Sequence, residues 1–398
     1  VLDAFPTLSE TFLYTLIQNL VNAGVRVKVV ARKRGKADQT PAFARDVRFL
    51  PGENFSAFLK LLVLLGMCAW YLFASPRKWF RFWQKIGQLE CDTPKRLQVA
   101  YRCMPLFFAN ADVIYLPFGG LAVMYAELFE ISSIPIVFSL RGSDIRIEPL
   151  VNPDYARLLQ RVMLKADRIH CVANDIKQVA IRLSGVSAEK LQVIYTSINP
   201  IFQSEPSFMD LNSPLRIISM GRLDWKKGLE HGMMSIAELQ KRGVSCTWEI
   251  VGEGPYRIPL EWAVRDMGLQ EVVMFSGAKK QDEIINHLKY ADIFFHPSVS
   301  EGLSNSVLEA MACGLPVVCS DVGGMREAIP SDEYGYLVPA RDWKSAAEAL
   351  NTLIANPDLR RQIGIRAAGW VRVKFTAEQQ VNGFMEMFQA AIQQGKSS

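Results

Sequence analysis

Apolar residues recur with two spacings along almost the whole chain, one typical of helices and one of strands. Residues 12–21 are apolar at helical spacing, and Gly24 ends the helix that they predict. Short apolar runs between such helices predict strands at 1–5, 25–30, 113–116, 135–140, 168–172, 216–219, 247–251, 272–275, 292–295 and 317–319. Strands that alternate with helices in this order favour parallel sheets, so we expect an α/β fold.

One segment interrupts this alternation near the middle of the chain. The stretch from Asn199 to Pro214 is rich in Pro, Asn and Ser, which predicts an interdomain linker. The last helix is predicted to begin after Thr376, with Gln379 three residues further on as its capping partner. Its predicted apolar face comprises Val381, Phe384, Met385, Phe388 and Ile392.

Length and charge narrow the possible partners. A chain of 398 residues fits two domains. Residues 1–206 hold 25 Lys and Arg against 17 Asp and Glu (25 − 17 = +8), and the remainder holds 20 against 23 (20 − 23 = −3). A basic half suggests an anionic partner such as phosphate or a membrane surface. Nucleic acid is not expected, because no recognition motif accompanies the charge.

The sequence contains no motif typical of a metal site or of a disulfide framework. The seven cysteines are scattered and odd in number, the four histidines share no metal-binding spacing, and no D-x-D triplet occurs. We therefore expect no metal and no cofactor. A reducing compartment fits these cysteines, and no secretory signal peptide is visible, so the cytoplasm is the expected location.

One apolar segment stands apart from the rest. Leu61 to Pro76 carries no charge, and a basic, aromatic run from Arg77 to Trp83 follows it. The segment is short for a transmembrane helix of about 20 residues. Two alternatives remain: a buried helix, or a helix at an anionic membrane interface with Trp and cations at the lipid headgroups. On the second alternative, Leu61–Trp83 would hold the protein peripherally on the inner membrane.

The chemistry-bearing residues gather in the second half. Glu301 follows a predicted strand, and Ser304 can cap the helix that comes next. In open α/β sheets, ligands bind beyond the carboxyl ends of the strands, where helix N-termini offer free N–H groups to phosphate. We therefore expect a ligand site formed by the Glu301 carboxylate, a good acceptor for sugar hydroxyls, together with Gly302 and the amides of Leu303–Asn305.

Two further loops follow predicted strands. The first runs from Gly221 to Gly228, and its Arg222 and Lys227 would neutralise a diphosphate leaving group. The second contains Gly252 and Gly254 and is compatible with a tight turn beside a ligand, although glycine-rich turns are common.

Together these motifs resemble the retaining glycosyltransferases of family 4, which have GT-B architecture. Glu301 and Glu309 match the E-x7-E signature of that family. Residues 5–12 resemble the opening of bacterial exopolysaccharide-type members, and Ser9 in that opening is included among the expected donor-binding residues. The resemblance covers the whole second half closely and the first half more loosely.

The resemblance implies an architecture and a reaction. Two doubly wound, Rossmann-like domains would face each other across a cleft: an acceptor-binding domain of residues 1–206 plus 376–398, and a donor-binding domain of residues 207–375. The last helix would return to the first domain. The reaction would transfer a hexose, with retention and without metal, from a nucleotide-diphosphate sugar (UDP-sugar favoured) to a glycan or lipid-linked acceptor in polysaccharide biosynthesis.

Residue roles also come from the resemblance. Glu301 would hold the donor sugar and Glu309 the ribose, while Arg222 and Lys227 would hold the diphosphate with help from amides near Leu303 and Ser304. The family often has a His-Gly pair where this chain has Arg141 and Gly142. Arg141 would then act catalytically by stabilising phosphate charge, or else would form a structural pair with Asp144.

Two other functions remain open at this point. The missing family histidine is compatible with a nucleotide-sugar-binding protein that has lost catalysis. A nucleotide-sugar epimerase of similar architecture is also possible, although the two motifs of the second half argue against it.

Overall fold

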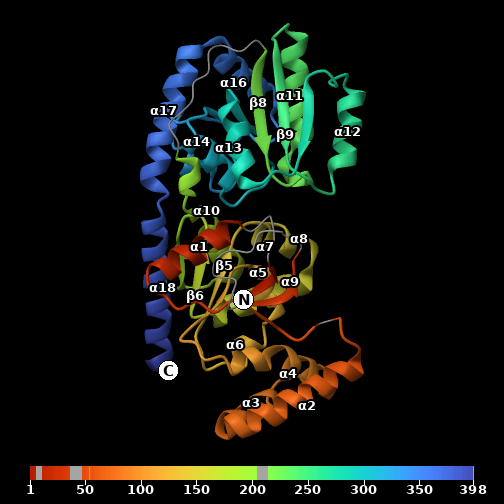
Figure 1. Cartoon of the computed structure of the whole chain (residues 1–398), viewed down its shortest axis with the longest axis vertical. Helices are drawn as coiled ribbons and strands as arrows, with labels where there is room; N and C mark the ends of the chain where they lie inside the picture. Colours follow the sequence, from red (N-terminus) through yellow and green to blue (C-terminus); the bar gives the residue numbers. More distant parts are fainter. Residues whose placement is uncertain (6–10, 36–46, 53, 204–213, 398) are drawn as a thin grey trace. The chain divides into compact units, whose positions relative to one another are not determined.

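The computed structural model describes residues 1–5, 11–35, 47–52, 54–203 and 214–397, in which helices surround three parallel sheets (Figure 1). Contacts between residues divide the chain into two compact units. Unit 1 comprises Val1–Cys171, Lys177–Ile194 and Val381–Ser398, and unit 2 comprises Val172–Ile176 and Tyr195–Gln380. The predicted α/β fold with parallel sheets is confirmed.

Unit 1 contains two of the sheets, and all of their strands pair in parallel. One sheet has the order β1 (Leu2–Phe5), β2 (Val30–Arg34), β3 (Arg48–Phe49). The other has the order β4 (Ile114–Leu116), β5 (Ile136–Leu140), β6 (Arg168–Cys171), β7 (Leu191–Val193). The two sheets are linked at Val1, whose amino group donates a hydrogen bond of 2.8 Å to the Tyr115 carbonyl at β4.

Eleven helices accompany these sheets in unit 1 within the described residues. They are α1 (Thr11–Asn22), α2 (Ala57–Ala74), α3 (Pro76–Gly87), α4 (Thr93–Phe107), α5 (Gly119–Met124), α6 (Leu128–Ile131), α7 (Ser143–Arg146), α8 (Glu148–Val151), α9 (Pro153–Lys165), α10 (Asn174–Ser184) and α18 (Ala377–Ser397). Helix α18 packs its apolar face against α1 and β5, where Phe384 and Phe388 join Leu16 and Val137. The predicted cap of α18 is confirmed, because the Thr376 hydroxyl accepts a hydrogen bond of 3.1 Å from the Gln379 amide.

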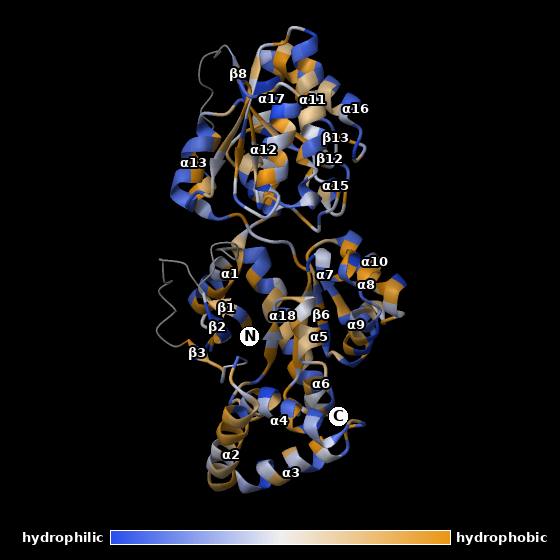
Figure 2. Ribbon diagram, turned by 90° about the vertical axis from the view of Figure 1, so that its right-hand side faces the viewer, coloured by the Kyte–Doolittle hydropathy of each residue, from blue (hydrophilic) through white to orange (hydrophobic). Residues whose placement is uncertain are grey.

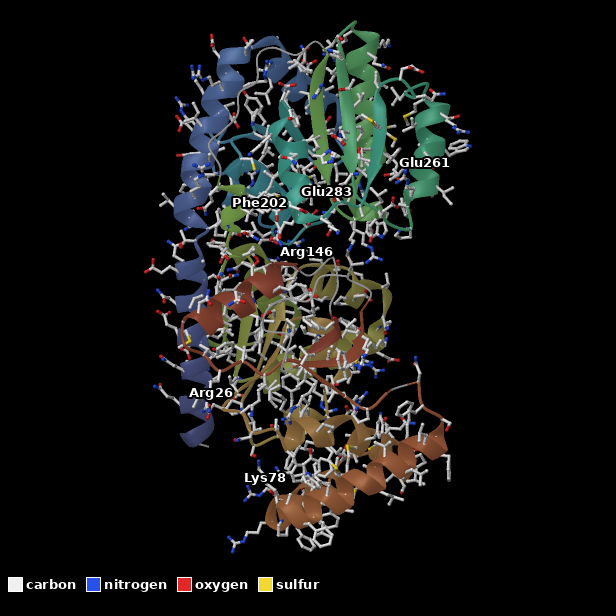
Figure 3. The ribbon with its side chains drawn as sticks, viewed as in Figure 1. Arg26, Lys78, Arg146, Phe202, Glu261 and Glu283 are labelled. Carbon is white, nitrogen blue, oxygen red and sulfur yellow. The ribbon has the colours of Figure 1, made fainter. Side chains whose placement is uncertain are left out.

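Unit 2 contains one six-stranded parallel sheet covered on both faces. Its strands lie in the order β10 (Val273–Gly277), β9 (Cys246–Val251), β8 (Leu215–Met220), β11 (Ile293–His296), β12 (Val317–Ser320), β13 (Tyr336–Val338). Its helices are α11 (Leu229–Lys241), α12 (Arg257–Asp266), α13 (Gln281–Lys289), α14 (Asn305–Ala312), α15 (Met325–Ala328), α16 (Trp343–Ala355) and α17 (Pro357–Lys374). Unit 2 also has 3-10 turns at Pro200–Phe202 and Trp225–Lys227, and unit 1 has one at Ala188–Lys190. One apolar cluster includes Trp248, and a second contains Phe294 and Phe202. Phe202 is labelled in Figure 3.

The structure moves one predicted strand. Residues 25–30 were predicted as a strand, but β2 begins only at Val30. The C-terminal turn of α1 accounts for part of the shift, because Gly24 has a φ of 87° and the Val25 amide bonds back to the Leu20 carbonyl. The pairing of β2 with β1 accounts for the rest of the shift, because β1 pairs only with residues from Ala31 to Arg34.

The units divide at other positions than the predicted domain boundaries after residues 206 and 375. Contacts place the division after Ile194 and after Gln380. Ile198 and Phe202 pack into the core of unit 2, and the Ser197 hydroxyl donates a hydrogen bond of 2.8 Å to the Gln380 side chain. These contacts attach the start of the predicted linker to unit 2.

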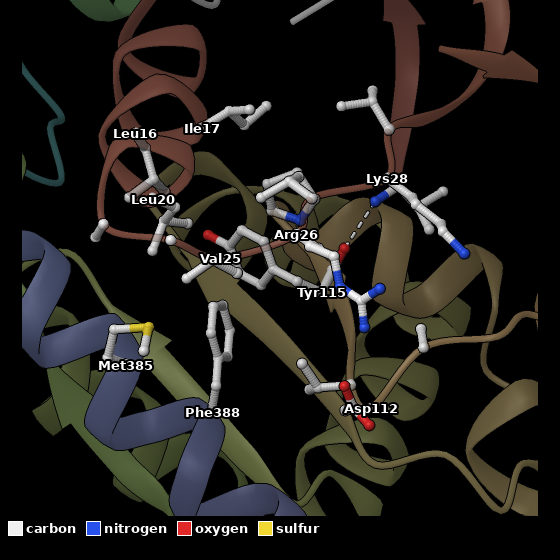
Figure 4. A pocket seen from close by; sticks show the side chains of 18 of the residues that line it. Leu16, Ile17, Leu20, Val25, Arg26, Lys28, Asp112, Tyr115, Met385 and Phe388 are labelled. Atoms are coloured by element: carbon white, nitrogen blue, oxygen red, sulfur yellow. Dashed lines mark hydrogen bonds between the residues drawn. The ribbon is translucent and has the colours of Figure 1, made fainter. Parts of the chain in front are cut away.

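A cavity of about 560 Å³ in unit 1 lies away from the predicted chemistry (Figure 4). Its lining includes Leu16 and Leu20 of α1, Phe388 of α18 and the stretch before β2, where the Lys28 ammonium donates a hydrogen bond of 3.2 Å to the Asn110 carbonyl. These segments approach the amino ends of β2 and β4. The side chains that predict ligand binding follow the carboxyl ends of other strands.

Candidate active site

Two neighbouring strands of unit 2 bring the predicted motifs together. β8 and β11 pair in parallel, so the loops that follow them leave the same edge of the sheet. The Val299 amide donates a hydrogen bond of 2.8 Å to the Lys226 carbonyl, which ties the two loops to each other. Gly228 has a φ of 56°, and a Cβ atom there would lie 2.3 Å from the Pro297 carbonyl oxygen. Glycine at this position therefore permits the close approach that places Lys227 beside Glu301.

One oxygen of the Glu301 carboxylate receives three contacts. Its Oε1 lies 2.7 Å from Lys227 Nζ, 2.8 Å from Ser298 Oγ and 3.0 Å from His296 Nε2. Because a carboxylate only accepts, the Nε2 atom of His296 must carry a proton for its contact to be a hydrogen bond. All three contacts fall on Oε1, so among the described residues Oε2 is the oxygen left for a ligand.

Electrostatics keep Glu301 ionised. Burial alone would raise the pKa of this carboxyl group, but the Lys227 ammonium and the His296 hydrogen bond outweigh burial and hold the pKa well below its usual range. Burial lowers the pKa of His296, which favours the neutral imidazole. The cluster therefore contains one negative charge, one cation and two neutral donors, His296 and Ser298.

Glu309 on α14 has a different environment. None of the described residues donates a hydrogen bond to its carboxylate, and burial raises its pKa to about 8. Burial therefore favours the protonated form of Glu309. The pKa values of the two glutamates of the E-x7-E signature are thus shifted in opposite directions.

The N-terminus of α14 is positioned as predicted, but its cap is not. Ser304 occupies the cap position without a side-chain bond to the helix amides, and its hydroxyl instead lies 3.0 Å from the Ser306 hydroxyl. The predicted capping by the Ser304 side chain is therefore wrong. The predicted end of the helix is confirmed, because Gly314 has a φ of 82° after the last turn. Leu303 packs against the apolar core, and Asn305 begins the helix.

The glycines of the predicted site make close backbone contacts. A Cβ atom on Gly252 would lie 1.8 Å from the Gly221 carbonyl oxygen, and one on Gly254 would lie 2.1 Å from the Leu223 carbonyl oxygen. The need for glycine at both positions follows from this loop packing without a ligand. Their predicted role in binding the donor stays a prediction.

A second pair of glycines supports the Glu301 loop, and the sequence did not single it out. The Gly324 amide donates a hydrogen bond of 2.6 Å to the Gly302 carbonyl. A Cβ atom on Gly323 would lie 2.2 Å from the Glu301 carbonyl oxygen. This loop after β12 therefore fixes the backbone that carries Glu301.

Three predicted residues are not among the contacts of Glu301 described above. Arg222 is exposed in the loop after β8. Arg141 lies in unit 1, after β5. Ser9 lies outside the described residues.

Arg141 does not form the predicted side-chain pair with Asp144. The Asp144 carboxylate instead accepts hydrogen bonds of 2.8–3.0 Å from the backbone amides of Arg141, Gly142 and Gly119. The guanidinium lies over the Phe12 ring, 4.4 Å from its centroid, and its Nε donates a hydrogen bond of 2.9 Å to the Pro117 carbonyl. The structural pairing considered for Arg141 is therefore wrong in its detail, because backbone amides already satisfy Asp144.

Sequence reasoning missed His296 and Ser298. A signal was available, because His296 is a polar residue at the end of an otherwise apolar strand and Ser298 lies two residues further on. Both residues are buried and contact Glu301. Among the described residues, no group of three His, Cys, Asp or Glu side chains could hold a metal ion.

Comparisons with known proteins show which sequence families the chain matches. Residues 9–201 match the family model described as Glycosyltransferase Family 4, and residues 207–370 match the one described as Glycosyl transferases group 1. The amylovoran biosynthesis glycosyltransferase AmsK of Erwinia amylovora is 28% identical over 367 residues, which cover 87% of this chain and 88% of that protein.

Solved structures show the same fold. Anabaena Alr3699/HepE, in complex with UDP and glucose, superposes with a TM-score of 0.73 at 18% identity and covers 98% of both chains. Sucrose-phosphate synthase from Thermosynechococcus elongatus gives a TM-score of 0.74 at 18% identity over 98% of this chain and 94% of that one. The fold and the matched families define a glycosyltransferase of GT-B architecture. The chain belongs to glycosyltransferase family 4.

Proposed function

We propose that this glycosyltransferase transfers a hexose, with retention of configuration and without a metal ion, from a nucleotide-diphosphate sugar. The observation that carries the proposal is the Glu301 carboxylate, whose Oε1 is held by Lys227, His296 and Ser298 while Oε2 is left to a ligand. A carboxylate fixed in this way can accept hydrogen bonds from sugar hydroxyls. The cation beside it can receive a phosphate oxygen.

The donor would lie along the carboxyl edge of the unit 2 sheet. Lys227 and Arg222 would balance the diphosphate charge, with the free amides at the start of α14 as further donors. Glu301 would orient the sugar and Glu309 the ribose. Unit 1 would bind the acceptor, and Arg141 would contribute positive charge there.

The reaction exchanges one bond at the anomeric carbon for another. The bond from this carbon to the diphosphate oxygen breaks, and the acceptor oxygen attacks from the same face. The acceptor proton passes to the departing phosphate oxygen, and the nucleoside diphosphate leaves. Positive charge develops on the sugar during this step, where the Glu301 carboxylate stabilises it, while Lys227 stabilises the negative charge on the diphosphate.

The favoured donor is a UDP-sugar, and the acceptor is a glycan or a lipid-linked glycan at the membrane. Anabaena Alr3699/HepE has been solved in complex with UDP and glucose and in complex with UDP-glucose, which supports this donor. The name of AmsK refers to amylovoran biosynthesis, which supports a role in making a polysaccharide.

A binding screen followed by a turnover assay tests the proposal. UDP-, GDP- and ADP-sugars are compared by thermal shift, where a donor at about 100 times its Kd should stabilise the protein by about 2.7 kcal/mol. The stabilising donor is then incubated with a panel of alkyl glycosides. Transfer to an acceptor is expected, whereas an isomerised donor or binding without turnover would contradict the proposal.

A further inference from the structure

Helix α2 exposes an uncharged apolar face along its whole length. Phe58, Leu61, Leu62, Leu65, Leu72 and Phe73 are all exposed, with Phe73 at 86% and Phe58 at 72%. Their spacing puts them on one side of the helix, about 27 Å long at 1.5 Å per residue. Helix α2 is the one helix of the described residues that is long and apolar enough to cross a membrane, and Figure 2 shows it hydrophobic along its length.

The opposite face of α2 is held by protein. Leu64 is buried, and the Tyr71 ring stacks on Phe108 at a centroid distance of 4.0 Å. Helices α2, α3 and α4 each contact the other two, and the buried Phe82 of α3 packs against Phe107 of α4. A helix fixed to α3 and α4 in this way can present one face to an apolar phase but cannot cross it alone.

Positive charge follows the same hairpin of α2 and α3. Residues 55–89 contain five basic residues and no Asp or Glu. Four of the five, Arg77, Lys78, Arg81 and Lys85, lie on α3. Figure 3 shows the Lys78 side chain pointing away from the helices.

We propose that the α2–α3 hairpin docks on an anionic bilayer, with the outer face of α2 in the acyl region and the α3 cations at the headgroups. Two partners could cover the exposed apolar face of α2: a second copy of the chain or an anionic lipid surface. The absence of acidic residues from the hairpin favours the lipid surface. A second copy of the chain would bring five positive charges against five, whereas an anionic lipid surface attracts them. This docking goes beyond the proposed function and does not rest on it, because unit 2 carries the donor chemistry.

The structure also changes which aromatic residues meet the lipid. Trp79 and Trp83 of the basic, aromatic run are half-buried, and both indole nitrogens are buried beside the Cys68 thiol of α2. The exposed aromatic residues of the hairpin are Phe58, Trp70 and Phe73 on α2 and Phe80 on α3, with Trp70 at 70%.

Vesicle sedimentation of the full chain tests the docking. Wild-type protein should bind vesicles that contain phosphatidylglycerol, bind pure phosphatidylcholine far less, and be released by salt. The double variant Leu65→Ser/Phe73→Ser should bind about 100-fold more weakly, at about tenfold for each large side chain that no longer enters the acyl region. Replacing Arg77, Lys78 and Arg81 by Ser should weaken binding about fivefold for each charge removed.

The control is Ile258→Ser, because Ile258 is 78% exposed on α12 in unit 2. It should bind vesicles as the wild type does. As a second measurement, the fluorescence change on vesicle binding should shrink in Trp70→Phe. All variants should keep wild-type transfer to soluble alkyl glycosides, which separates docking from catalysis.

Three results would overturn the docking. The first is unchanged vesicle binding by Leu65→Ser/Phe73→Ser, and the second is an equal loss in Ile258→Ser. The third is a wild-type chain that ignores vesicles but forms a dimer that Leu65→Ser/Phe73→Ser dissociates, since the occupant of the α2 face would then be a second copy.

Discussion

Glu301→Gln and Glu309→Gln should damage the enzyme in different ways. Glu301 is ionised and stands beside Lys227, at the position where the donor sugar would gain positive charge. Its carboxylate therefore interacts more strongly with the transition state than with the bound donor. Glu309 would face the ribose, which does not change during the reaction, so its interaction is equal in both states.

The contacts at Oε1 determine how large a loss in kcat we expect for Glu301→Gln. Glutamine keeps the size of the side chain and can still accept a hydrogen bond from Lys227 Nζ, now 2.7 Å from Oε1, but it removes the full charge. Loss of one charge-stabilising group costs about 10²- to 10³-fold in kcat, and we expect about 10²-fold because Lys227 already balances part of this charge. For Glu309→Gln, loss of one hydrogen bond of about 1 kcal/mol raises the donor KM about fivefold and leaves kcat nearly unchanged.

Steady-state kinetics of both variants, with donor affinity measured by calorimetry, decides between these roles. Glu301→Gln should lose turnover while it keeps its affinity for the donor. If Glu301→Gln abolishes binding of the free nucleoside diphosphate while Glu309→Gln affects only turnover, the assignment of the two residues is reversed.

Three further predictions follow from the same site. Transfer should survive EDTA, because Arg222 and Lys227 supply the positive charge; activity that EDTA abolishes and magnesium or manganese restores would contradict this. The pKa of Glu309 is raised from 4.5 to about 8 in the folded chain, so the folded state binds the proton more tightly and wild-type stability is lost as pH rises through about 8. In urea unfolding, Glu309→Gln should therefore gain stability relative to wild type at about pH 9 compared with about pH 6. The gain is up to about 1.4 kcal/mol for each pH unit from about 6 to about 8, and an equal effect at both pH values would refute the shift. Ser304→Ala should cost less stability than the ~1 kcal/mol of a lost helix cap, because its hydroxyl bonds Ser306 instead; a full cap penalty in thermal unfolding would show that Ser304 caps α14 in solution.

The local pattern predicted those parts of the site that lie within one strand–loop–helix unit. Glu301, the start of α14 and Gly314 follow from the order of apolar and polar residues there. Lys227 was also predicted, but its contact with Glu301 depends on β8 and β11 being neighbours. Strand order is set by packing across the whole sheet, and spacing in the sequence does not contain it.

Contacts between distant segments account for what the sequence could not supply. The Asp144 carboxylate accepts a hydrogen bond from the Gly119 amide, which is distant in the sequence. The sequence around Arg141 therefore could not show that backbone amides, and not the Arg141 side chain, bind this carboxylate. The environment of Trp79 could not be predicted from the sequence either, because an amphipathic ring fits both a lipid headgroup and a protein interior. The packing of α3 on α2 buries its indole nitrogen within the protein.

Proton NMR of the first transfer product tests the central claim most directly. An α-linked donor such as UDP-glucose, or whichever nucleotide sugar stabilises the protein, is incubated with an alkyl glycoside in the presence of EDTA. The account predicts an α-linked product, formed by wild type and about 10²-fold more slowly by Glu301→Gln. A β-linked product, or transfer that is equally fast in Glu301→Gln, would contradict it.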